Sequence, residues 1–187
     1  GFKILDVGCG SGKQCFLYND TLKGQAEING GDFSEELLGK ARAKNKERGS
    51  NIDFQFLDFN KPFNFADNTF DLCTSAFAIY YASDLKFTFG EAHRVLKPGG
   101  RAFVLEFSQV SQPLLARLYD LYSFKLLPRM GKLFANDEAS YRYLAESIRK
   151  HPDQETLLGM LRDAGLEDCR YHNLSGGIVA LHVGVKC

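Results

Sequence analysis

Residues 6–12 form the stretch whose composition best suits the binding of a nucleotide-like ligand. The stretch reads Asp-Val-Gly-Cys-Gly-Ser-Gly and follows the apolar pair Ile4-Leu5, which is typical of a strand. A helix-like segment opens directly after it, at Lys13. Glycine has no Cβ and tolerates positive φ, so such a turn lets backbone N–H groups approach a ligand closely. The residues predicted to contact a ligand here are Gly8, Gly10 and Gly12.

Three kinds of nucleotide site compete with an ordinary glycine turn as the explanation. A phosphate-binding P-loop is excluded, because Val7 stands where its first Gly belongs and Gln14 replaces its Ser/Thr. The dinucleotide fingerprint G-x-G-x-x-G fits only in part, because Lys13 stands at its last glycine. The third pattern, Asp-x-Gly-x-Gly-x-Gly, resembles motif I of class I S-adenosylmethionine (SAM) methyltransferases. SAM carries an ammonium and no pyrophosphate, so the carboxylate of Asp6 suits it electrostatically.

Three aspartates are predicted to end successive strands, at Asp6, Asp32 and Asp58. Ligands of open α/β sheets bind outside the carboxyl ends of the strands. Asp32 lies 20 residues beyond Gly12 and is placed to accept both ribose hydroxyls. Asp6 would orient the methionine ammonium, directly or through water. A single aspartate at a strand end is commonly a cap or turn residue, but three behind a glycine loop favour a binding site.

Aromatic and small polar residues complete the predicted cofactor site. Asp58 is suited to accept a hydrogen bond from the adenine amino group, and Phe59 beside it offers an apolar ring. Phe33 follows Asp32 directly and is assigned to the same site. At the end of the fourth predicted strand, the backbone of Ser75 is expected to contact the methionine part of the ligand.

Length and composition describe one globular domain, predicted to span residues 1–187. Lys+Arg and Asp+Glu are both 23, so there is no basic field of the kind that binds nucleic acid. The five cysteines form no C-x-x-C pair and no His/Cys cluster, which indicates reduced thiols, an intracellular protein and no metal site. The chain starts just before the first predicted strand, so we expect an N-terminal segment to be missing.

Periodicity and turn residues predict alternating strands and helices. The predicted strands are 3–7, 25–31, 52–57, 70–77, 101–107, 166–174 and 178–185, and the predicted helices are 13–22, 34–48, 84–96 and 154–164. Lys97-Pro98-Gly99-Gly100 is expected to separate the third helix from the fifth strand. Residues 112–150 are predicted to be a mostly helical, aromatic-rich insertion. An α/β sheet closed by an antiparallel hairpin is the methyltransferase version of the doubly wound fold, whereas a dinucleotide dehydrogenase continues with parallel units.

A longer series of motifs identifies a family more sharply. The series contains Glu91-Ala92-His93-Arg94-Val95-Leu96-Lys97-Pro98-Gly99-Gly100-Arg101 and Leu105-Glu106-Phe107-Ser108. It continues with Ser140-Tyr141-Arg142-Tyr143-Leu144-Ala145-Glu146-Ser147-Ile148, His151-Pro152-Asp153-Gln154 and Asn173-Leu174-Ser175-Gly176-Gly177. Together these resemble the ubiquinone/menaquinone-biosynthesis C-methyltransferase family (UbiE type). The match is close over residues 91–187 and looser before them.

The resemblance implies a Rossmann-like class I methyltransferase fold with a seven-stranded sheet, and SAM-dependent methylation of a ring carbon on a polyprenyl benzoquinol or naphthoquinol. A positioned base would remove the phenolic proton, and no metal would be needed. The family usually reads Phe-Gly-Ile/Leu-Arg-Asn after the fourth strand, whereas this chain reads Phe77-Ala78-Ile79-Tyr80-Tyr81. Tyr80 therefore stands at the position of the family's Arg. Tyr80, Tyr81 and Tyr141 are the predicted catalytic residues, on the substrate side of the pocket.

The same resemblance implies a lipid-tailed substrate and raises questions of assembly and location. Peripheral contact with a membrane and either a homodimer or a quinone-synthesis complex are the expected partners, in the cytoplasm or the mitochondrial matrix. Tyr80-Tyr81 leaves two other functions open: methylation of another small phenol, and a non-catalytic SAM-binding subunit of a quinone-synthesis complex. A dinucleotide oxidoreductase is the most distant alternative.

Overall fold

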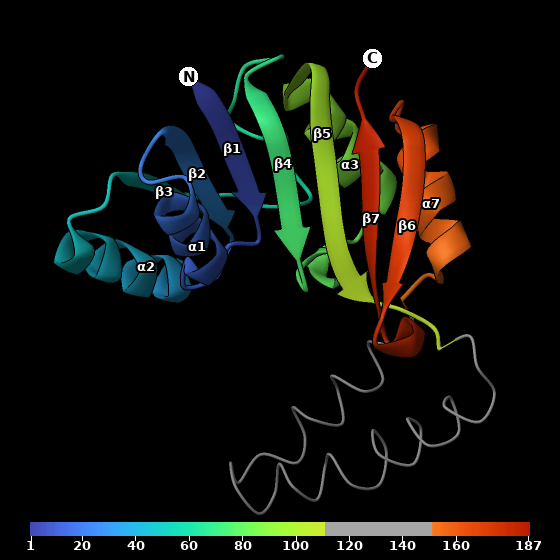
Figure 1. The fold of residues 1–187 in the computed structure, drawn as a ribbon, viewed down its shortest axis with the longest axis horizontal. Helices are drawn as coiled ribbons and strands as arrows, with labels where there is room; N and C mark the ends of the chain where they lie inside the picture. Colours follow the sequence, from blue (N-terminus) through green and yellow to red (C-terminus); the bar gives the residue numbers. More distant parts are fainter. Residues whose placement is uncertain (111–150) are drawn as a thin grey trace, which may run out of the picture.

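A seven-stranded sheet runs through residues 1–110 and 151–187, the part of the chain that the computed structural model describes (Figure 1). Its strand order is β3-β2-β1-β4-β5-β7-β6. β1 to β5 are parallel, whereas β7 is antiparallel to both β5 and β6. The strands are β1 (Phe2–Val7), β2 (Ala26–Asp32), β3 (Ile52–Phe56), β4 (Phe70–Ala76), β5 (Leu96–Phe107), β6 (Glu167–Leu174) and β7 (Val179–Val185). The helices are α1 (Lys13–Thr21), α2 (Glu35–Arg48), α3 (Leu85–Val95) and α7 (Gln154–Asp163), with short 3-10 turns η1 (Ile79–Tyr81) and η4 (Ser175–Gly177).

This architecture confirms the predicted α/β class, the seven-stranded Rossmann-like sheet and its C-terminal antiparallel hairpin. The two hairpin strands are joined through η4, at the Ser175-Gly176-Gly177 segment that the sequence marks as a turn. The predicted helical insertion at 112–150, including Tyr141, lies outside the described residues. Among those that are described, we find no helical segment with the length and hydropathy of a bilayer span.

β5 begins earlier than predicted. The expected break at residues 97–100 is part of the strand, because Leu96 pairs with Phe70 of β4. Gly99 N–H also donates to the carbonyl of Lys186 (2.6 Å), and Lys186 N–H donates to Gly100 (2.9 Å). The helix does end before residues 97–100, as predicted, but the predicted strand start at Arg101 was too late. The partners that extend the strand are distant in the sequence and cannot be read from the local Pro-Gly-Gly pattern.

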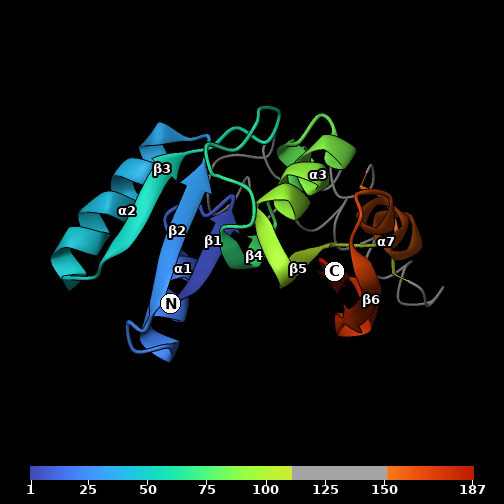
Figure 2. The same cartoon turned by 90° about the horizontal axis from the view of Figure 1, so that it is seen from above.

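Two hydrophobic cores lie on opposite faces of the sheet, as the alternation of side chains along a strand requires. One core joins Leu5 and Val7 of β1 to Phe89 and Val95 of α3 and to Leu157 and Leu161 of α7. The other joins Ile4 of β1 to Cys15 and Phe16 of α1, Leu38 of α2 and Phe54 of β3. Figures 1 and 2 show α3 and α7 side by side on one face of the sheet, and the two helices are in contact. Burial of each large apolar side chain stabilises the fold by roughly 1.5–3 kcal/mol, so both layers hold the strand ends firmly.

The parallel strands β1 to β5 all end at one side of the sheet, which we call the carboxyl edge. Helix α2 begins here because Ser34 caps it, its Oγ accepting from Leu37 N–H (3.3 Å), and Glu35 and Glu36 occupy its first turn. Asp84 caps α3 in the same way, its Oδ1 accepting from Phe87 N–H (3.1 Å). These caps fix the loops between strand and helix, which are the loops that carry the predicted site.

Cysteines occur on both sides of the sheet and none forms a disulfide. Cys9, Cys15 and Cys73 are buried, Cys169 is half-buried and Cys187 is exposed. The pKa of the Cys15 thiol is raised well above its ordinary value. The main cause is its hydrogen bond with the Cys9 side chain, and the second is burial. Among the described residues there is no group of three or more His, Cys, Asp or Glu side chains arranged to hold a metal ion.

Candidate active site

The glycine loop, residues 8–12, links β1 to α1 at the carboxyl edge. Gly8, Gly10 and Gly12 all have positive φ, at 80°, 55° and 79°, a conformation that side chains disfavour. Gly8 N–H and Cys9 N–H both donate to the carbonyl of Gly31 in β2 (2.7 and 3.0 Å). A Cβ on Gly8 would lie 2.2 Å from the Cβ of Ala78, so this glycine permits a very close approach of the segment after β4.

Asp32 ties the glycine loop to the end of β2. Its Oδ2 accepts from Gly10 N–H (2.8 Å) and its Oδ1 accepts from Ser34 N–H (2.8 Å), with only 5% of the residue exposed. A dinucleotide site would direct loop N–H groups at a pyrophosphate. In this chain a carboxylate already occupies the Gly10 N–H, which disfavours a phosphate there and suits a ligand without one.

Asp6 lies beneath the glycine loop and is 2% exposed. Its Oδ1 accepts from the Thr74 hydroxyl of β4 (2.8 Å), and Cys15 Sγ lies 3.4 Å from its Oδ2. Burial raises the pKa of Asp6 to about 6, although the bonds from Thr74 and Cys15 act in the opposite direction. Because both oxygens are buried and have partners, the structure favours the indirect route predicted from the sequence, through water, over direct contact with an ammonium.

An aromatic wall continues the site beyond Asp32. Phe33 is 42% exposed, and its ring centroid lies 6.1 Å from that of Phe59 and 5.2 Å from that of Tyr81. Tyr80 and Tyr81 follow β4, with their ring centroids 4.2 Å apart. Phe59 is only 2% exposed and packs under the loop, so Phe33 is the ring that presents a surface to a ligand.

Asp58 anchors the loop after β3. Its Oδ1 accepts from Asn60 N–H (3.0 Å), and Lys61 Nζ lies 3.5 Å from its Oδ2. The Asn60 N–H, rather than the lysine, is the main cause that lowers the pKa of Asp58. Asn60 Oδ1 in turn accepts from Ser83 N–H (2.8 Å), which connects this loop to the residues following η1.

The end of β4 contributes a buried polar atom, the hydroxyl of Ser75. Ser75 is buried, and its Oγ has no hydrogen-bond partner among the described residues. An unpaired buried hydroxyl is costly, and a ligand group can satisfy it. The sequence expectation assigned the Ser75 backbone to the methionine part of the cofactor. The register with Val104 of β5 puts the Ser75 side chain on the face of the sheet that carries the core with α3.

Glu106 is a residue of this region to which the sequence assigned no function. It is 1% exposed in β5, and its Oε1 accepts from Ala78 N–H (2.7 Å) and Ile79 N–H (3.0 Å). Burial raises the pKa of Glu106 to about 7, while the N–H groups of Ile79, Ala78 and Phe107 lower it. The available signal was a carboxylate directly after the apolar run Ala102-Phe103-Val104-Leu105, within Leu105-Glu106-Phe107-Ser108.

The structure brings the predicted site residues that it describes to one edge of the sheet. They are Asp6, Gly8, Gly10, Gly12, Asp32, Phe33, Asp58, Phe59, Ser75, Tyr80 and Tyr81. The strand order reverses between β1 and β4, and this switch point is where open α/β sheets bind ligands. Tyr141 is not among the described residues.

Solved structures of similar fold define the class of protein. A SAM-dependent methyltransferase from Aquifex aeolicus has a TM-score of 0.73 at 19% identity, covering 100% of this chain and 82% of that one. Phosphoethanolamine N-methyltransferase 2 from Haemonchus contortus, solved with SAM, has a TM-score of 0.74 at 15% identity, covering 100% of this chain and 49% of that one. The chain thus has the fold of class I SAM-dependent methyltransferases, a fold that serves acceptors of more than one kind.

Sequence comparison then identifies the family. The profile of the ubiE/COQ5 methyltransferase family matches residues 1–186. A Cellvibrio japonicus (strain Ueda107) protein named ubiquinone/menaquinone biosynthesis C-methyltransferase UbiE is 46% identical over 188 aligned residues, which cover 100% of this chain and 75% of that protein. The chain belongs to the ubiE/COQ5 methyltransferase family, which confirms the family and the methyltransferase activity predicted from the sequence.

Proposed function

We propose that this protein transfers a methyl group from SAM to a ring carbon of a lipid-tailed benzoquinol or naphthoquinol. The observation that carries the proposal is the 46% identity to the Cellvibrio japonicus UbiE protein over the whole of this chain. The site at the carboxyl edge agrees with it, because its acids and aromatic rings match the chemical groups of SAM. When bound, SAM supplies an electrophilic methyl group on a sulfonium.

The residues of the glycine loop and the neighbouring strand ends fit SAM well. Asp32 would accept from the ribose hydroxyls with the lone pairs that its backbone bonds leave open. Phe33 would cover the adenine ring, and Asp58 would accept from the adenine amino group. Asp6 and Ser75 would serve the methionine part, the first through its negative charge and the second through its backbone at the end of β4.

On the acceptor side, the ring carbon becomes a good nucleophile once the adjacent phenol, with a pKa near 10, loses its proton. Tyr80 and Tyr81 are the proposed residues that orient the quinol hydroxyl and form a wall against its ring. Tyrosine provides both a donor and an acceptor at its hydroxyl and keeps water from the ring face. An apolar site strengthens the attraction between a phenolate and a sulfonium, so exclusion of water assists the reaction.

A lipid-tailed acceptor has consequences for location and assembly. We include peripheral contact with a membrane in the proposal, because the acceptor is dissolved in the bilayer. A homodimer or a quinone-synthesis complex, and a cytoplasmic or mitochondrial-matrix location, belong to the same proposal. Exposed apolar side chains near the carboxyl edge, at Phe33, Phe77, Tyr81 and Leu174, agree with such contact.

Calorimetry and a transfer assay test the function together. The protein is expected to bind SAM and, with a demethylated quinol in detergent, to yield a product heavier by one methyl group in mass spectrometry. Asp32→Ala should weaken SAM binding roughly 10–100-fold, since it removes a charged acceptor from the ribose and from Gly10. Asp53→Ala, at an exposed position of β3, is the matched control and should leave the affinity unchanged. Absence of SAM binding by the unsubstituted protein would sink the proposal.

One observation favours a second candidate. Tyr80 stands where the family has Arg, and a tyrosine does not supply that fixed cation. Methylation of another small phenol is therefore the alternative, and assaying a panel of phenols beside the demethylated quinols separates the two. SAM binding without turnover on any acceptor would instead support a non-catalytic subunit of a quinone-synthesis complex.

A further inference from the structure

The segment that carries Tyr80 and Tyr81 is attached to β5 at its start. We call residues 77–83 the Tyr80 turn. Phe77 N–H donates to the carbonyl of Leu105 (2.9 Å). The next two N–H groups, of Ala78 and Ile79, both donate to Oε1 of Glu106 (2.7 and 3.0 Å). Three successive N–H groups of the turn are therefore held by two successive residues of β5.

The other contacts of the Tyr80 turn are with loops of the predicted cofactor site. Ala78 packs on Gly8 so closely that a Cβ on that glycine would lie 2.2 Å from the Cβ of Ala78. At the far end of the turn, Ser83 N–H donates to Asn60 Oδ1 (2.8 Å), and Asn60 N–H donates to Asp58 (3.0 Å). The turn is thus fixed between the glycine loop, the loop after β3 and the end of β5.

Phe77 adopts a conformation that must be imposed by these contacts. Its φ is 53°, in the left-handed region that a bulky residue rarely adopts. Its ring packs against that of Phe107, with 4.8 Å between the centroids. Strained residues persist only where the surroundings determine them, and they cluster at functional sites. The bond from its own N–H to Leu105 and the bonds from the next two N–H groups to Glu106 are the surroundings that hold the strain.

A contribution to stability does not by itself explain a carboxylate at position 106. It is 1% exposed, and a buried carboxylate is disfavoured unless its partners compensate for the lost hydration. The partners that the structure gives it are backbone N–H groups at the beginning of η1, and the N-terminal N–H groups of a helical turn attract an anion. The carboxylate caps η1 from a different strand, which determines where the two tyrosines lie.

We infer that Glu106 is a positioning residue for the methyl acceptor: it fixes the Tyr80 turn against the glycine loop and thereby sets the place of Tyr80 and Tyr81. Glu106 acts through the turn, and no contact between its carboxylate and the substrate is required. This inference rests on the proposed function, and it adds a residue of β5 to the determinants of the acceptor site.

Variants of Glu106 separate its effect on the acceptor from its effect on the cofactor. Glu106→Gln keeps an acceptor oxygen of the same reach, whereas Glu106→Ala removes it. For Glu106→Ala, kcat/KM for the demethylated quinol is expected to fall roughly 10–100-fold, because the tyrosines lose their fixed position. Glu106→Gln should restore part of that loss. The dissociation constant of SAM should change by less than about threefold in both variants, since the bonds lost belong to the turn.

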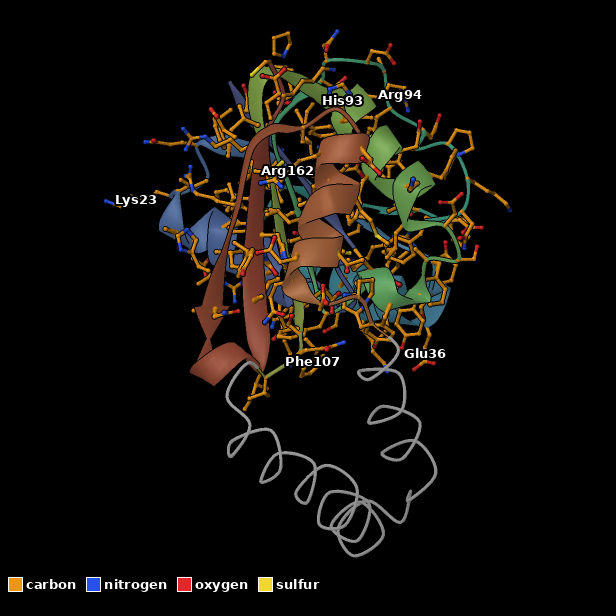
Figure 3. The ribbon with its side chains drawn as sticks, turned by 90° about the vertical axis from the view of Figure 1, so that its right-hand side faces the viewer. Lys23, Glu36, His93, Arg94, Phe107 and Arg162 are labelled. Atoms are coloured by element: carbon orange, nitrogen blue, oxygen red, sulfur yellow. The ribbon has the colours of Figure 1, made fainter. Side chains whose placement is uncertain are left out.

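Glu91→Gln is the matched control. Glu91 is also buried and also holds a loop, because its Oε2 accepts from Phe63 N–H (2.6 Å), but it belongs to α3 and pairs with Arg94 (2.8 Å). Figure 3 places Arg94 near one end of the molecule and Phe107, the residue after Glu106, near the other. Glu91→Gln should lower the melting temperature of the protein. It should leave the ratio of the quinol KM to the SAM dissociation constant unchanged.

Hydrogen exchange of the Ala78 and Ile79 amides provides a measurement that needs no activity. In Glu106→Ala these two amides are expected to exchange at least about tenfold faster than in the unsubstituted protein, and in Glu106→Gln at an intermediate rate. The Phe63 amide should be unaffected in both variants. Unchanged exchange at Ala78 and Ile79 would overturn the inference even in a protein without turnover, and so would unchanged quinol kinetics in an active one. If the unsubstituted protein neither binds SAM nor methylates a quinol, the proposed function fails separately, and exchange still decides the role of Glu106.

Discussion

At the scale of single residues, Asp6 and Asp32 illustrate how two carboxylates at adjacent strand ends acquire different properties. Asp32 accepts from two backbone N–H groups. Asp6 is bonded to a hydroxyl and a thiol, and burial raises its pKa from 3.8 to about 6. Because the folded protein holds the Asp6 proton more tightly than the unfolded chain, this aspartate favours folding when protonated. Its contribution is complete below pH 3.8 and is lost as the pH rises through about 6.

Replacing Asp6 should therefore alter how stability depends on pH. Asp6→Asn cannot ionise, so the unfolding free energy of the wild type should fall relative to that of the variant by about 3 kcal/mol between pH 4 and 7. Urea unfolding at several pH values measures this difference. Asp153 is the control of opposite sign, because the Thr156 N–H lowers its pKa. Asp153→Asn should lose stability relative to the wild type as the pH rises, and a parallel pH dependence of wild type and Asp6→Asn would contradict the assignment.

At the scale of elements, the loops are well specified by sequence and the contacts between them are not. The glycines of residues 8–12 and the three strand-end acids follow a recognisable local pattern, so their position at the carboxyl edge was predictable. Glu106 was not, because its partners Ala78 and Ile79 lie 28 and 27 residues before it. The early start of β5 was hidden for the same reason, since Phe70 and Lys186 supply its pairing. Nonlocal hydrogen bonds leave little trace in a local pattern.

Packing between the glycine loop and the Tyr80 turn gives a prediction for two glycines. Gly8→Ala would place a methyl group 2.2 Å from the Cβ of Ala78 at a φ of 80°. We expect it to reduce the unfolding free energy by roughly 3 kcal/mol, from steric overlap and backbone strain together. Gly39→Ala, in exposed space on α2, should instead stabilise by about 0.5–1 kcal/mol. Denaturant unfolding of both variants measures the two changes in unfolding free energy. Equal changes for Gly8→Ala and Gly39→Ala would contradict the prediction.

At the scale of the whole molecule, most residues proposed for SAM and those proposed for the acceptor follow strands on opposite sides of the reversal between β1 and β4, and Ser75 of β4 is proposed for SAM although it lies on the acceptor side. β1 to β3 supply the glycine loop, Asp32 and Asp58, whereas β4 and β5 supply Ser75, the Tyr80 turn and Glu106. The alternation of strands and helices and the final hairpin were sufficient to predict the α/β class, the seven strands and the antiparallel hairpin, but not the strand order.

Binding of SAM to the glycine loop and the neighbouring strand ends should stabilise the entire domain. At a SAM concentration of 100 times its dissociation constant, the gain is about 2.7 kcal/mol, which raises the melting temperature of a chain of this size by roughly 5–10 °C. Differential scanning fluorimetry measures the shift. NADH at the same concentration is the control and should give none, because Asp32 occupies the loop N–H that a pyrophosphate would need. An NADH shift equal to that of SAM would point to a dinucleotide site.

The antiparallel direction of β7 has a practical consequence for experiments on lipid-bound acceptors. It returns the chain to the side of the sheet opposite the carboxyl edge, where Lys186 pairs with Gly100 and Cys187 is exposed (Figure 1). The other four cysteines are buried or half-buried. A thiol-reactive surface or fluorophore can therefore be attached at Cys187 without engineering, and the immobilised protein would present its carboxyl edge outward, toward vesicles in the solution above it.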